Sequence, residues 1–192
     1  MGGDTLRVRN AQPAVFLDRD GVLNEAIIRE GKPHPPRDPT ELVITQGARA
    51  ALEELEREGY LLIVVTNQPD VARGKANRVN VSAINAQLAA ILPLDAIVVC
   101  EHDDKEECDC RKPKPGMILR ARERFGVDLA LSFMVGDRWR DIEAGRRAGC
   151  RTILIGDGYG ETFPSAPTIK LASLPEAASW ILQQPKRSLE IT

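Results

Sequence analysis

Short apolar runs bounded by turn residues recur along the chain. Several of them are rich in Val and Ile, which is typical of buried parallel strands. We predict a strand in each of five runs: Ala14–Leu17, Leu61–Val65, Ala96–Val99, Ser132–Val135 and Thr152–Ile155. The fifth is predicted to be the last strand of the sheet, and the glycine-rich segment Gly156–Gly160 after it to be a surface turn.

Helical periodicity fills the segments between these runs. Gly47–Glu58 and Val81–Leu92 each place apolar residues on one face. Pro115–Phe125 begins with proline, which is favoured in a first helical turn. Ser173–Glu176 has the pattern of a capping box and predicts a final helix that runs to about Leu182.

The alternation of strand and helix predicts right-handed crossovers and a three-layer α/β/α fold around a doubly wound, mostly parallel sheet. A chain of 192 residues is long enough for one well-covered core. No linker or repeat interrupts it, so we expect a single domain over residues 1–192, with a frayed tail at 183–192. Ligands of such sheets bind outside the carboxyl ends of the strands, so the residues that follow each strand are the candidates for function.

The composition, with 43% hydrophobic and 28% charged residues, is that of an ordinary globular protein. A net charge of −2 gives no overall field that would hold an anionic polymer, so any anion site must be local. No run approaches the roughly 18 apolar residues of a membrane span, and the first residues lack the apolar core of a signal peptide. We therefore expect a cytoplasmic protein that binds neither nucleic acid nor a membrane.

Two aspartates follow the first predicted strand directly. Asp18 and Asp20 are separated by one residue, and ionised aspartates are rarely buried without a partner. A divalent cation is the simplest such partner, and Mg²⁺ prefers oxygen ligands of this kind. The pair alone carries little information, because acidic residues after a strand more often cap a helix or lie in a solvated turn.

Donors and cations follow the later strands. Thr66 and Asn67 end the second predicted strand and offer a hydroxyl and an amide to a phosphate. Arg111 and Lys112 precede two prolines in Arg-Lys-Pro-Lys-Pro, which stiffen the backbone that carries these cations. These groups therefore suit a phosphate site at the same edge of the sheet as the aspartates.

A further pair of acids follows the fourth predicted strand. Asp137 comes directly after Gly136, and Asp141 lies about one helical turn later if a helix begins there. Both carboxylates could then serve one metal site, one as a ligand and the other in support. Together the strand ends carry a carboxylate pair, a hydroxyl, a lysine and further acids, which are the groups that phosphoryl transfer requires.

This set of residues, in this order, resembles the haloacid dehalogenase (HAD) superfamily of phosphohydrolases over most of Ala14–Ile155. The resemblance implies a phosphatase in which Asp18 is the nucleophile that forms an aspartyl phosphate. Asp20 would protonate the leaving oxygen and later activate water.

The resemblance also implies the ligands of a catalytic Mg²⁺. Asp18, the main-chain carbonyl of Asp20 and Asp137 would hold the ion, with Asp141 in support. The expected phosphate-binding residues are Thr66, Asn67 and Lys112.

Three cysteines and a histidine cluster before the lysine motif. Cys100, His102, Cys108 and Cys110 form the ligand set of a closed tetrahedral structural Zn²⁺ site. This pattern favours metal ligation in a reducing compartment over a disulfide framework. The metal would fix a loop, residues 100–110, that leads straight into Arg111.

A zinc loop before the lysine narrows the resemblance to one subgroup of the superfamily. It contains D-glycero-D-manno-heptose 1,7-bisphosphate phosphatases and the phosphatase domain of histidinol-phosphate phosphatases, and similar motifs here are Asp-Arg-Asp-Gly-Val-Leu-Asn and Cys-Arg-Lys-Pro-Lys-Pro-Gly-Met. Its members lack a large cap domain, so loops would shape the pocket and Arg111 would reach the substrate. Arg73 and Lys75 are candidates for contact with a second phosphate.

The expected substrate is a small sugar phosphate, namely heptose 1,7-bisphosphate cleaved at the 7-position, and the protein is expected to be a monomer. Histidinol phosphate is the alternative substrate. A non-catalytic phosphoacceptor or phosphate-binding module is the alternative from another class, since receiver domains combine similar residues. In receivers, however, the acceptor aspartate follows a middle strand, whereas Asp18 follows the first.

Overall fold

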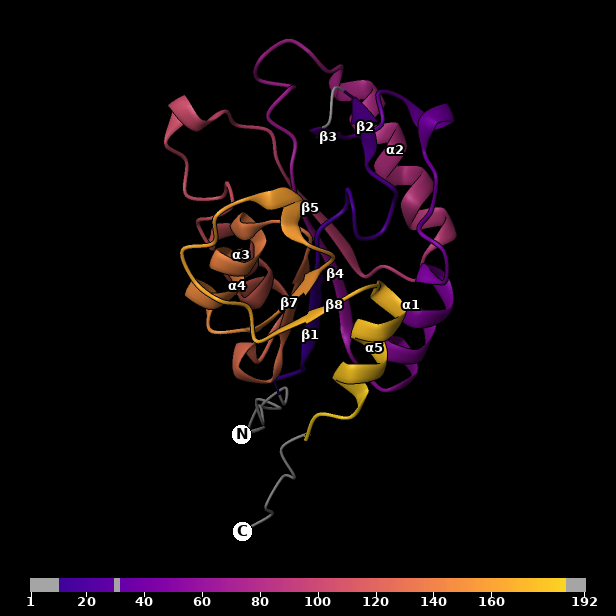
Figure 1. Ribbon diagram of the computed structural model, residues 1–192, viewed down its shortest axis with the longest axis vertical. Helices are drawn as coiled ribbons and strands as arrows, with labels where there is room; N and C mark the ends of the chain where they lie inside the picture. The colour runs from indigo at the N-terminus through magenta and orange to yellow at the C-terminus, as the bar shows by residue number, and fades with distance from the viewer. Residues whose placement is uncertain (1–10, 30–31, 186–192) are drawn as a thin grey trace, which may run out of the picture.

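The computed structural model describes residues 11–29 and 32–185, and its centre is a six-stranded parallel sheet (Figure 1). In spatial order the strands are β5 (Ala96–Cys100), β4 (Leu61–Asn67), β1 (Ala14–Leu17), β6 (Phe133–Gly136), β7 (Arg151–Ile155) and β8 (Ile169–Leu171). The five predicted strands are confirmed, and so is the doubly wound α/β class.

The prediction that Thr152–Ile155 is the last strand is wrong. β8 pairs with β7 at the edge of the sheet, with Ile153 opposite Ile169 and Ile155 opposite Leu171. No apolar run marks this strand, because it has three residues and the middle one, Lys170, is exposed. An edge strand needs only one paired side, so a short, half-solvated segment can serve.

Helices cover both faces of the sheet. On one side lie α1 (Ala48–Arg57), α2 (Arg78–Ile91) and α5 (Leu174–Leu182), and on the other α3 (Gly116–Phe125) and α4 (Trp139–Ala148) (Figure 1). The alternation of side chains along a strand produces the two cores. In β1, for example, Val15 and Leu17 belong to the first core, whereas Ala14 and Phe16 belong to the second.

Side-chain caps set where two of these helices begin. Asn77 accepts a hydrogen bond from the main-chain N–H of Val79, so α2 begins at Arg78, three residues before the predicted start. Ser173 accepts from the N–H of Glu176 at the start of α5, as the capping box predicts. α5 ends at Leu182, and of the expected frayed tail, residues 186–192 lie outside the described part of the chain.

A small antiparallel hairpin lies above the carboxyl end of the sheet (Figure 1). It consists of β2 (Ile27–Arg29) and β3 (Lys32–His34), with Ile27 opposite His34. The 3₁₀ turn Pro39–Glu41 follows it, and an ion pair of 3.1 Å joins Arg29 to Glu41. The hairpin was not predicted, because its strands are too short for a periodic pattern. Among the described residues, the hairpin and this turn are the regular elements between β1 and α1, so no large cap domain is inserted there.

The order of the strands determines where a ligand can bind. From β1 the chain moves to β4 and β5 on one side and then returns to β6 on the other. Loops on the two sides of β1 diverge at this switch point and leave a crevice at the carboxyl ends of β1, β4 and β6. Among the described residues, none of the helices is both long and apolar enough to cross a bilayer.

Candidate active site

A cavity of about 790 Å³ opens at the switch point. Its floor includes Asp18 after β1, Asp137 after β6 and Lys112 from the loop that follows β5. The hairpin and its following loop line the opposite wall, through residues such as His34 and Arg37. The fold thus brings together strand ends that are distant in the sequence.

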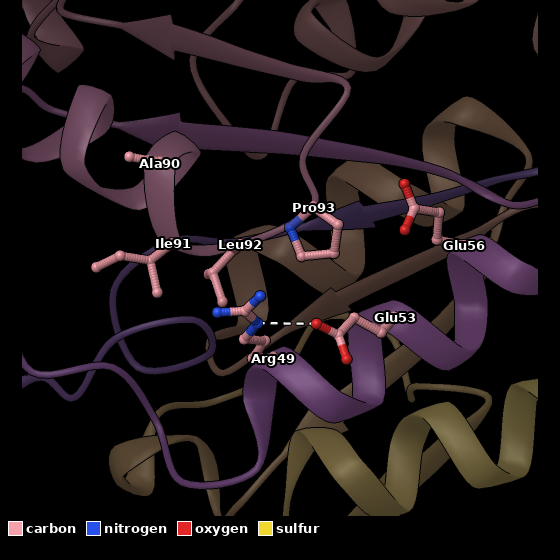
Figure 2. A pocket seen from close by; sticks show the side chains of 7 residues that line it. All are labelled: Arg49, Glu53, Glu56, Ala90, Ile91, Leu92 and Pro93. Atoms are coloured by element: carbon pink, nitrogen blue, oxygen red, sulfur yellow. Dashed lines mark hydrogen bonds and ion pairs between the residues drawn. The ribbon is translucent and has the colours of Figure 1, made fainter.

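A second, shallower pocket of about 320 Å³ lies between α1 and the end of α2 (Figure 2). Its most prominent polar contact is an ion pair of 2.8 Å between Arg49 and Glu53, one turn apart on α1. Such exposed pairs on a helix surface are common and contribute little to stability. This pocket has none of the strand-end residues, so we assign the chemistry to the larger cavity.

Lys112 is the electrostatic centre of that cavity. Its Nζ lies 2.8 Å from Asp18 Oδ1 and 2.6 Å from Asp141 Oδ1, and all three side chains are buried or nearly so. Burial alone would lower the pKa of Lys112, but Asp141 and Asp18 outweigh that effect and raise the pKa. The lysine is therefore held as a cation next to the carboxylate predicted to be the nucleophile.

A third carboxylate, that of Asp137, lies close to the two that are paired with Lys112. Oxygens of Asp18, Asp137 and Asp141 lie within 4.8 Å of one another. Burial raises the pKa of Asp18 to about 7, and burial followed by the charges of Asp18 and Asp141 raises the pKa of Asp137 well above its usual value. Asp137 Oδ1 is buried and has no hydrogen-bond partner.

These features fit a divalent cation. The cluster has an uncompensated negative charge, hard oxygen donors and one orphaned buried oxygen, and Mg²⁺ would satisfy all three. Asp141 also accepts a hydrogen bond of 3.0 Å from the main-chain N–H of Arg138, so its second oxygen is already engaged. That arrangement suits the supporting role predicted for Asp141. The side chain of Asp20 is not in the cluster, and its role through the main-chain carbonyl stays a prediction.

Asp20 is held from three sides by residues that sequence reasoning missed. Arg19 is fully buried and donates hydrogen bonds to the Asp20 carboxylate from Nε at 3.2 Å and from Nη2 at 3.0 Å. Its Nη1 donates to Asn85 Oδ1 of α2 at 2.9 Å. Gln68 Nε2 donates to Asp20 Oδ2 at 2.8 Å, and Asn24 Nδ2 to Oδ1 at 3.1 Å. The sequence indicated these residues only by position, since Arg19 and Asn24 lie within the motif Asp-Arg-Asp-Gly-Val-Leu-Asn and Gln68 follows Asn67. Their effect is to fix the carboxylate in one orientation.

The two predicted phosphate donors after β4 have different surroundings. Thr66 Oγ1 accepts a hydrogen bond of 2.9 Å from Gln68, which leaves its own hydroxyl hydrogen free to donate. The amide of Asn67 donates to the carbonyl of Lys112 at 3.0 Å and accepts from its N–H at 3.1 Å. Asn67 therefore positions the Lys112 backbone, and its direct contact with phosphate stays a prediction.

Three arginines of the cavity wall are paired with the zinc-loop acids. Arg111 Nε lies 2.7 Å from Asp104 Oδ1, and Arg140 Nη1 lies 3.3 Å from the same oxygen. Arg73 Nε donates to Asp103 at 3.0 Å. The structure thus places the predicted Arg111 and Arg73 in the cavity wall and adds Arg140, which no sequence signal indicated.

Gly21 lets the first loop pass against Asp137. Its φ is +89°, and an added Cβ would lie 1.9 Å from Asp137 Oδ2. We expect Gly21→Ala to displace Asp137 and to weaken Mg²⁺ binding by at least about tenfold, in addition to a backbone cost of roughly 1–2 kcal/mol. Calorimetric titration with Mg²⁺ and thermal melts would measure both effects.

Gly59 provides the matched control for this prediction. Its φ is +84°, but nothing lies within 4 Å of an added Cβ. Gly59→Ala should therefore show the backbone cost and leave Mg²⁺ binding unchanged. Equal Mg²⁺ affinities of the two variants would contradict the role of Gly21.

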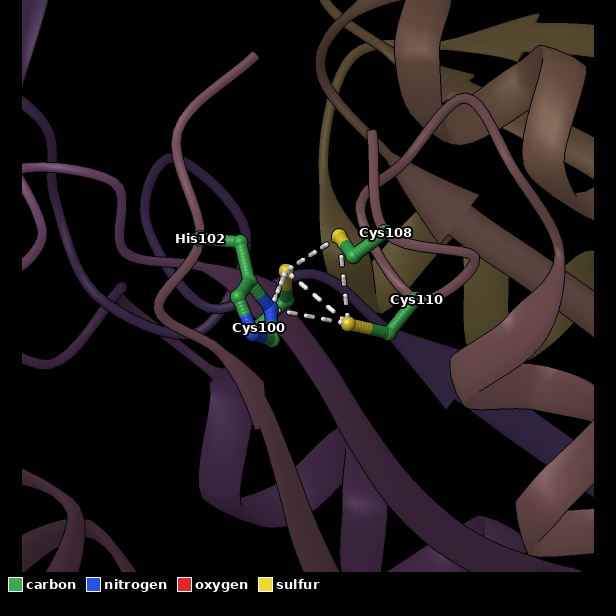
Figure 3. Close-up of side chains that lie close together, drawn as sticks. All are labelled: Cys100, His102, Cys108 and Cys110. Carbon is green, nitrogen blue, oxygen red and sulfur yellow. Dashed lines mark hydrogen bonds between the residues drawn. The ribbon is translucent and has the colours of Figure 1, made fainter. Parts of the chain in front are cut away.

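The four predicted zinc ligands converge (Figure 3). The distances between Sγ atoms are 3.3 Å for Cys100 and Cys110, 3.4 Å for Cys108 and Cys110, and 3.8 Å for Cys100 and Cys108. His102 Nδ1 lies 3.3 Å from Cys110 Sγ and 3.6 Å from Cys100 Sγ. A tetrahedron with metal–sulfur bonds of about 2.3 Å has edges of about 3.8 Å, so the ligand set and its spacing fit Zn²⁺.

Known proteins share both the sequence and the fold of this chain. A HAD-hydrolase-like family model matches residues 109–177. The D-glycero-beta-D-manno-heptose-1,7-bisphosphate 7-phosphatase of Vibrio cholerae serotype O1 is 37% identical in an alignment of 191 positions, which covers 92% of this chain and 100% of the relative. The enzyme of the same name from Escherichia coli K12 is 36% identical in an alignment of 183 positions, which covers 88% of each chain.

Solved structures agree with these sequence matches. The D,D-heptose 1,7-bisphosphate phosphatase of B. bronchiseptica, complexed with magnesium and phosphate, superposes with a TM-score of 0.76 at 32% identity, over 89% of this chain and 98% of that one. The D,D-heptose 1,7-bisphosphate phosphatase of Burkholderia thailandensis has a TM-score of 0.63 at 27% identity, over 90% and 100%. The chain is thus a phosphatase of the HAD superfamily, and it belongs to the heptose 1,7-bisphosphate phosphatase family.

Proposed function

We propose that this protein hydrolyses D-glycero-β-D-manno-heptose 1,7-bisphosphate to the 1-phosphate and inorganic phosphate. The observation that carries the proposal is the buried constellation of Asp18, Lys112 and Asp137, set in a chain that aligns with heptose bisphosphate phosphatases over nearly its whole length. A cavity of about 790 Å³ is large enough for a sugar bisphosphate.

The first step transfers the phosphoryl group to the protein. A carboxylate oxygen of Asp18 forms a bond to phosphorus as the ester P–O bond breaks, and the leaving sugar oxygen takes a proton from Asp20. Lys112 and the free hydroxyl hydrogen of Thr66 stabilise the charge on the phosphoryl oxygens. Mg²⁺, when bound by Asp18, Asp137 and the Asp20 carbonyl, would supply further neutralisation of that charge.

The second step releases phosphate. Asp20, now a carboxylate, takes a proton from a water molecule, whose oxygen attacks the phosphorus of the aspartyl phosphate. The acyl phosphate P–O bond breaks and Asp18 is restored. Arg19, Gln68 and Asn24 support both steps, since they keep Asp20 in one place while its proton is exchanged.

The second phosphate needs cations away from the nucleophile. Arg111, Arg73 and Lys75 all line the cavity. Arg111 and Arg73 are already paired with Asp104 and Asp103, whereas no ion pair engages the Lys75 side chain within the described ranges. Lys75 is therefore available to a phosphate without the loss of an existing ion pair.

Zinc completes the proposal as a structural ion. Held by the four converging ligands, it would fix the acids of its loop, and with them Arg111. A monomer in the cytoplasm, with no nucleic-acid or membrane partner, remains part of the proposal. The cluster of potential thiolate ligands favours such a reducing compartment.

Phosphate release from a substrate panel tests the proposal. The panel contains both anomers of the heptose bisphosphate, histidinol phosphate and simple sugar phosphates, each with Mg²⁺ and with EDTA. The heptose bisphosphate should have a kcat/KM at least about tenfold above histidinol phosphate and the simple sugar phosphates, because only a bisphosphate can use both ends of the cavity. Equal or faster turnover of histidinol phosphate would assign the protein to the alternative reaction.

A further inference from the structure

A tyrosine from a distant loop reaches the candidate metal site. Tyr159 lies in the 3₁₀ turn Gly158–Gly160, within the segment that the sequence analysis treats as a surface turn. Its hydroxyl donates a hydrogen bond of 2.9 Å to Asp137 Oδ2. The other oxygen of that carboxylate, Oδ1, is the buried atom without a partner.

The backbone of Tyr159 is in a conformation that aromatic residues rarely adopt. Its φ and ψ are 52° and 32°, in the left-handed region, which is unfavourable for a residue with a Cβ. Strain of this kind persists only where the surroundings impose it and is concentrated at functional sites. Here the imposed conformation directs the phenol toward Asp137.

Two neighbouring contacts hold the turn in place. Phe163 packs against Gly158, where an added Cβ would lie 2.5 Å from its ring. Glu161 accepts a hydrogen bond of 3.1 Å from Arg138 Nε, which joins the turn to the residue after Asp137. The turn is thus attached to the start of α4 at two points, Tyr159–Asp137 and Glu161–Arg138.

Asp137 Oδ2 is confined on two sides. Gly21 lies so close that an added Cβ would be 1.9 Å from Oδ2, and the Tyr159 hydroxyl is bonded to the same atom. Rotation of the carboxylate would break this hydrogen bond. Oδ1 is therefore the oxygen left for a cation.

We propose that Tyr159 is a positioning residue of the metal site, whose hydroxyl holds Asp137 Oδ2 so that Oδ1 is presented to the divalent cation. The inference rests on the proposed Mg²⁺ site. Residues that orient a metal ligand in this way commonly contribute about 10- to 100-fold to metal affinity. A merely structural role would instead fasten the loop and leave the affinity unchanged.

Calorimetric titration of the metal-free protein with Mg²⁺ distinguishes the two roles without substrate. Tyr159→Phe keeps the ring and removes the hydroxyl, and it should raise the Kd by about tenfold or more. Because Tyr159 is 43% exposed, the variant should remain folded, and a thermal melt verifies this. Glu161→Gln, the matched control, replaces the ion pair at the other attachment of the turn with a weaker neutral hydrogen bond and should leave the Kd within about twofold of wild type.

Each remaining outcome overturns the inference. A Kd for Tyr159→Phe within about twofold of wild type, or an equal weakening by Glu161→Gln, would leave the tyrosine with a structural role only. A wild-type protein that binds no Mg²⁺ would reject the metal site of the proposed function as well. The first two results leave that site intact, so the two failures can be told apart.

Discussion

Asp18→Asn is expected to lower kcat by about 10⁴-fold or more, because the amide cannot attack phosphorus as a carboxylate does and no other described acid takes its place. Asp20 is held by Arg19, Gln68 and Asn24, and Asp141 is bonded to Lys112 and to the Arg138 main chain. Phosphate release with saturating substrate measures the effect. Mass spectrometry should detect the phosphorylated wild type but no phosphorylated variant.

The variant should not lose activity by unfolding. Burial raises the folded-state pKa of Asp18 to about 7, above its value in an unfolded chain, so the ionised carboxylate costs stability as pH rises through that value. Without Mg²⁺ at about pH 8, Asp18→Asn should therefore melt no lower than wild type. Asp157→Asn, at an exposed position, is the matched control and should keep its activity. A kcat of Asp18→Asn within tenfold of the wild-type value would contradict the covalent mechanism.

Cys110→Ala is expected to release zinc and to lower the melting temperature by roughly 10 °C, since loss of a structural metal costs about 4 kcal/mol or more. Cys110 is buried, and its sulfur lies 3.3 to 3.4 Å from the ligand atoms of all three other residues. The zinc loop carries Asp104, which pairs with Arg111 and Arg140, so KM should rise as well. Elemental analysis and thermal melts measure the two primary effects.

Cys150→Ala controls for the loss of a buried sulfur. Cys150 lies in the same apolar core as Cys110, and burial raises the pKa of its thiol to about 12, so it behaves as a small apolar residue. Its replacement should cost about 1 kcal/mol, or roughly 2–4 °C, with zinc retained. Protein purified without zinc, or equal melting of the two variants, would reject the loop assignment.

Much of the fold and the site follows from short-range pattern. The apolar runs predict β1, β4, β5, β6 and β7, because a buried parallel strand needs a continuous apolar segment. The zinc ligands lie within one loop, so their spacing alone indicates a tetrahedral set. The strand-end acids Asp18 and Asp137 were identifiable because a parallel sheet gathers the residues that follow its strands.

Short elements without a periodic pattern escaped prediction. β8 and the β2–β3 hairpin have three residues per strand, and their stability comes from pairing with the sheet or with each other. The hairpin forms one wall of the cavity, so the shape of the substrate pocket depended on the structure.

What the sequence by itself determined is therefore the fold class and the residues expected at the site, namely four candidate zinc ligands, the predicted nucleophile Asp18, Lys112 and the acids. What only the tertiary structure decided is how these side chains are engaged: Lys112 between Asp18 and Asp141, Arg19 and Gln68 on Asp20, and Tyr159 on Asp137. Apart from the contact between the neighbours Arg19 and Asp20, these contacts join residues far apart in the chain, up to 94 positions for Lys112 and Asp18. No local periodicity encodes them, because they depend on which loops the packed sheet brings to one edge.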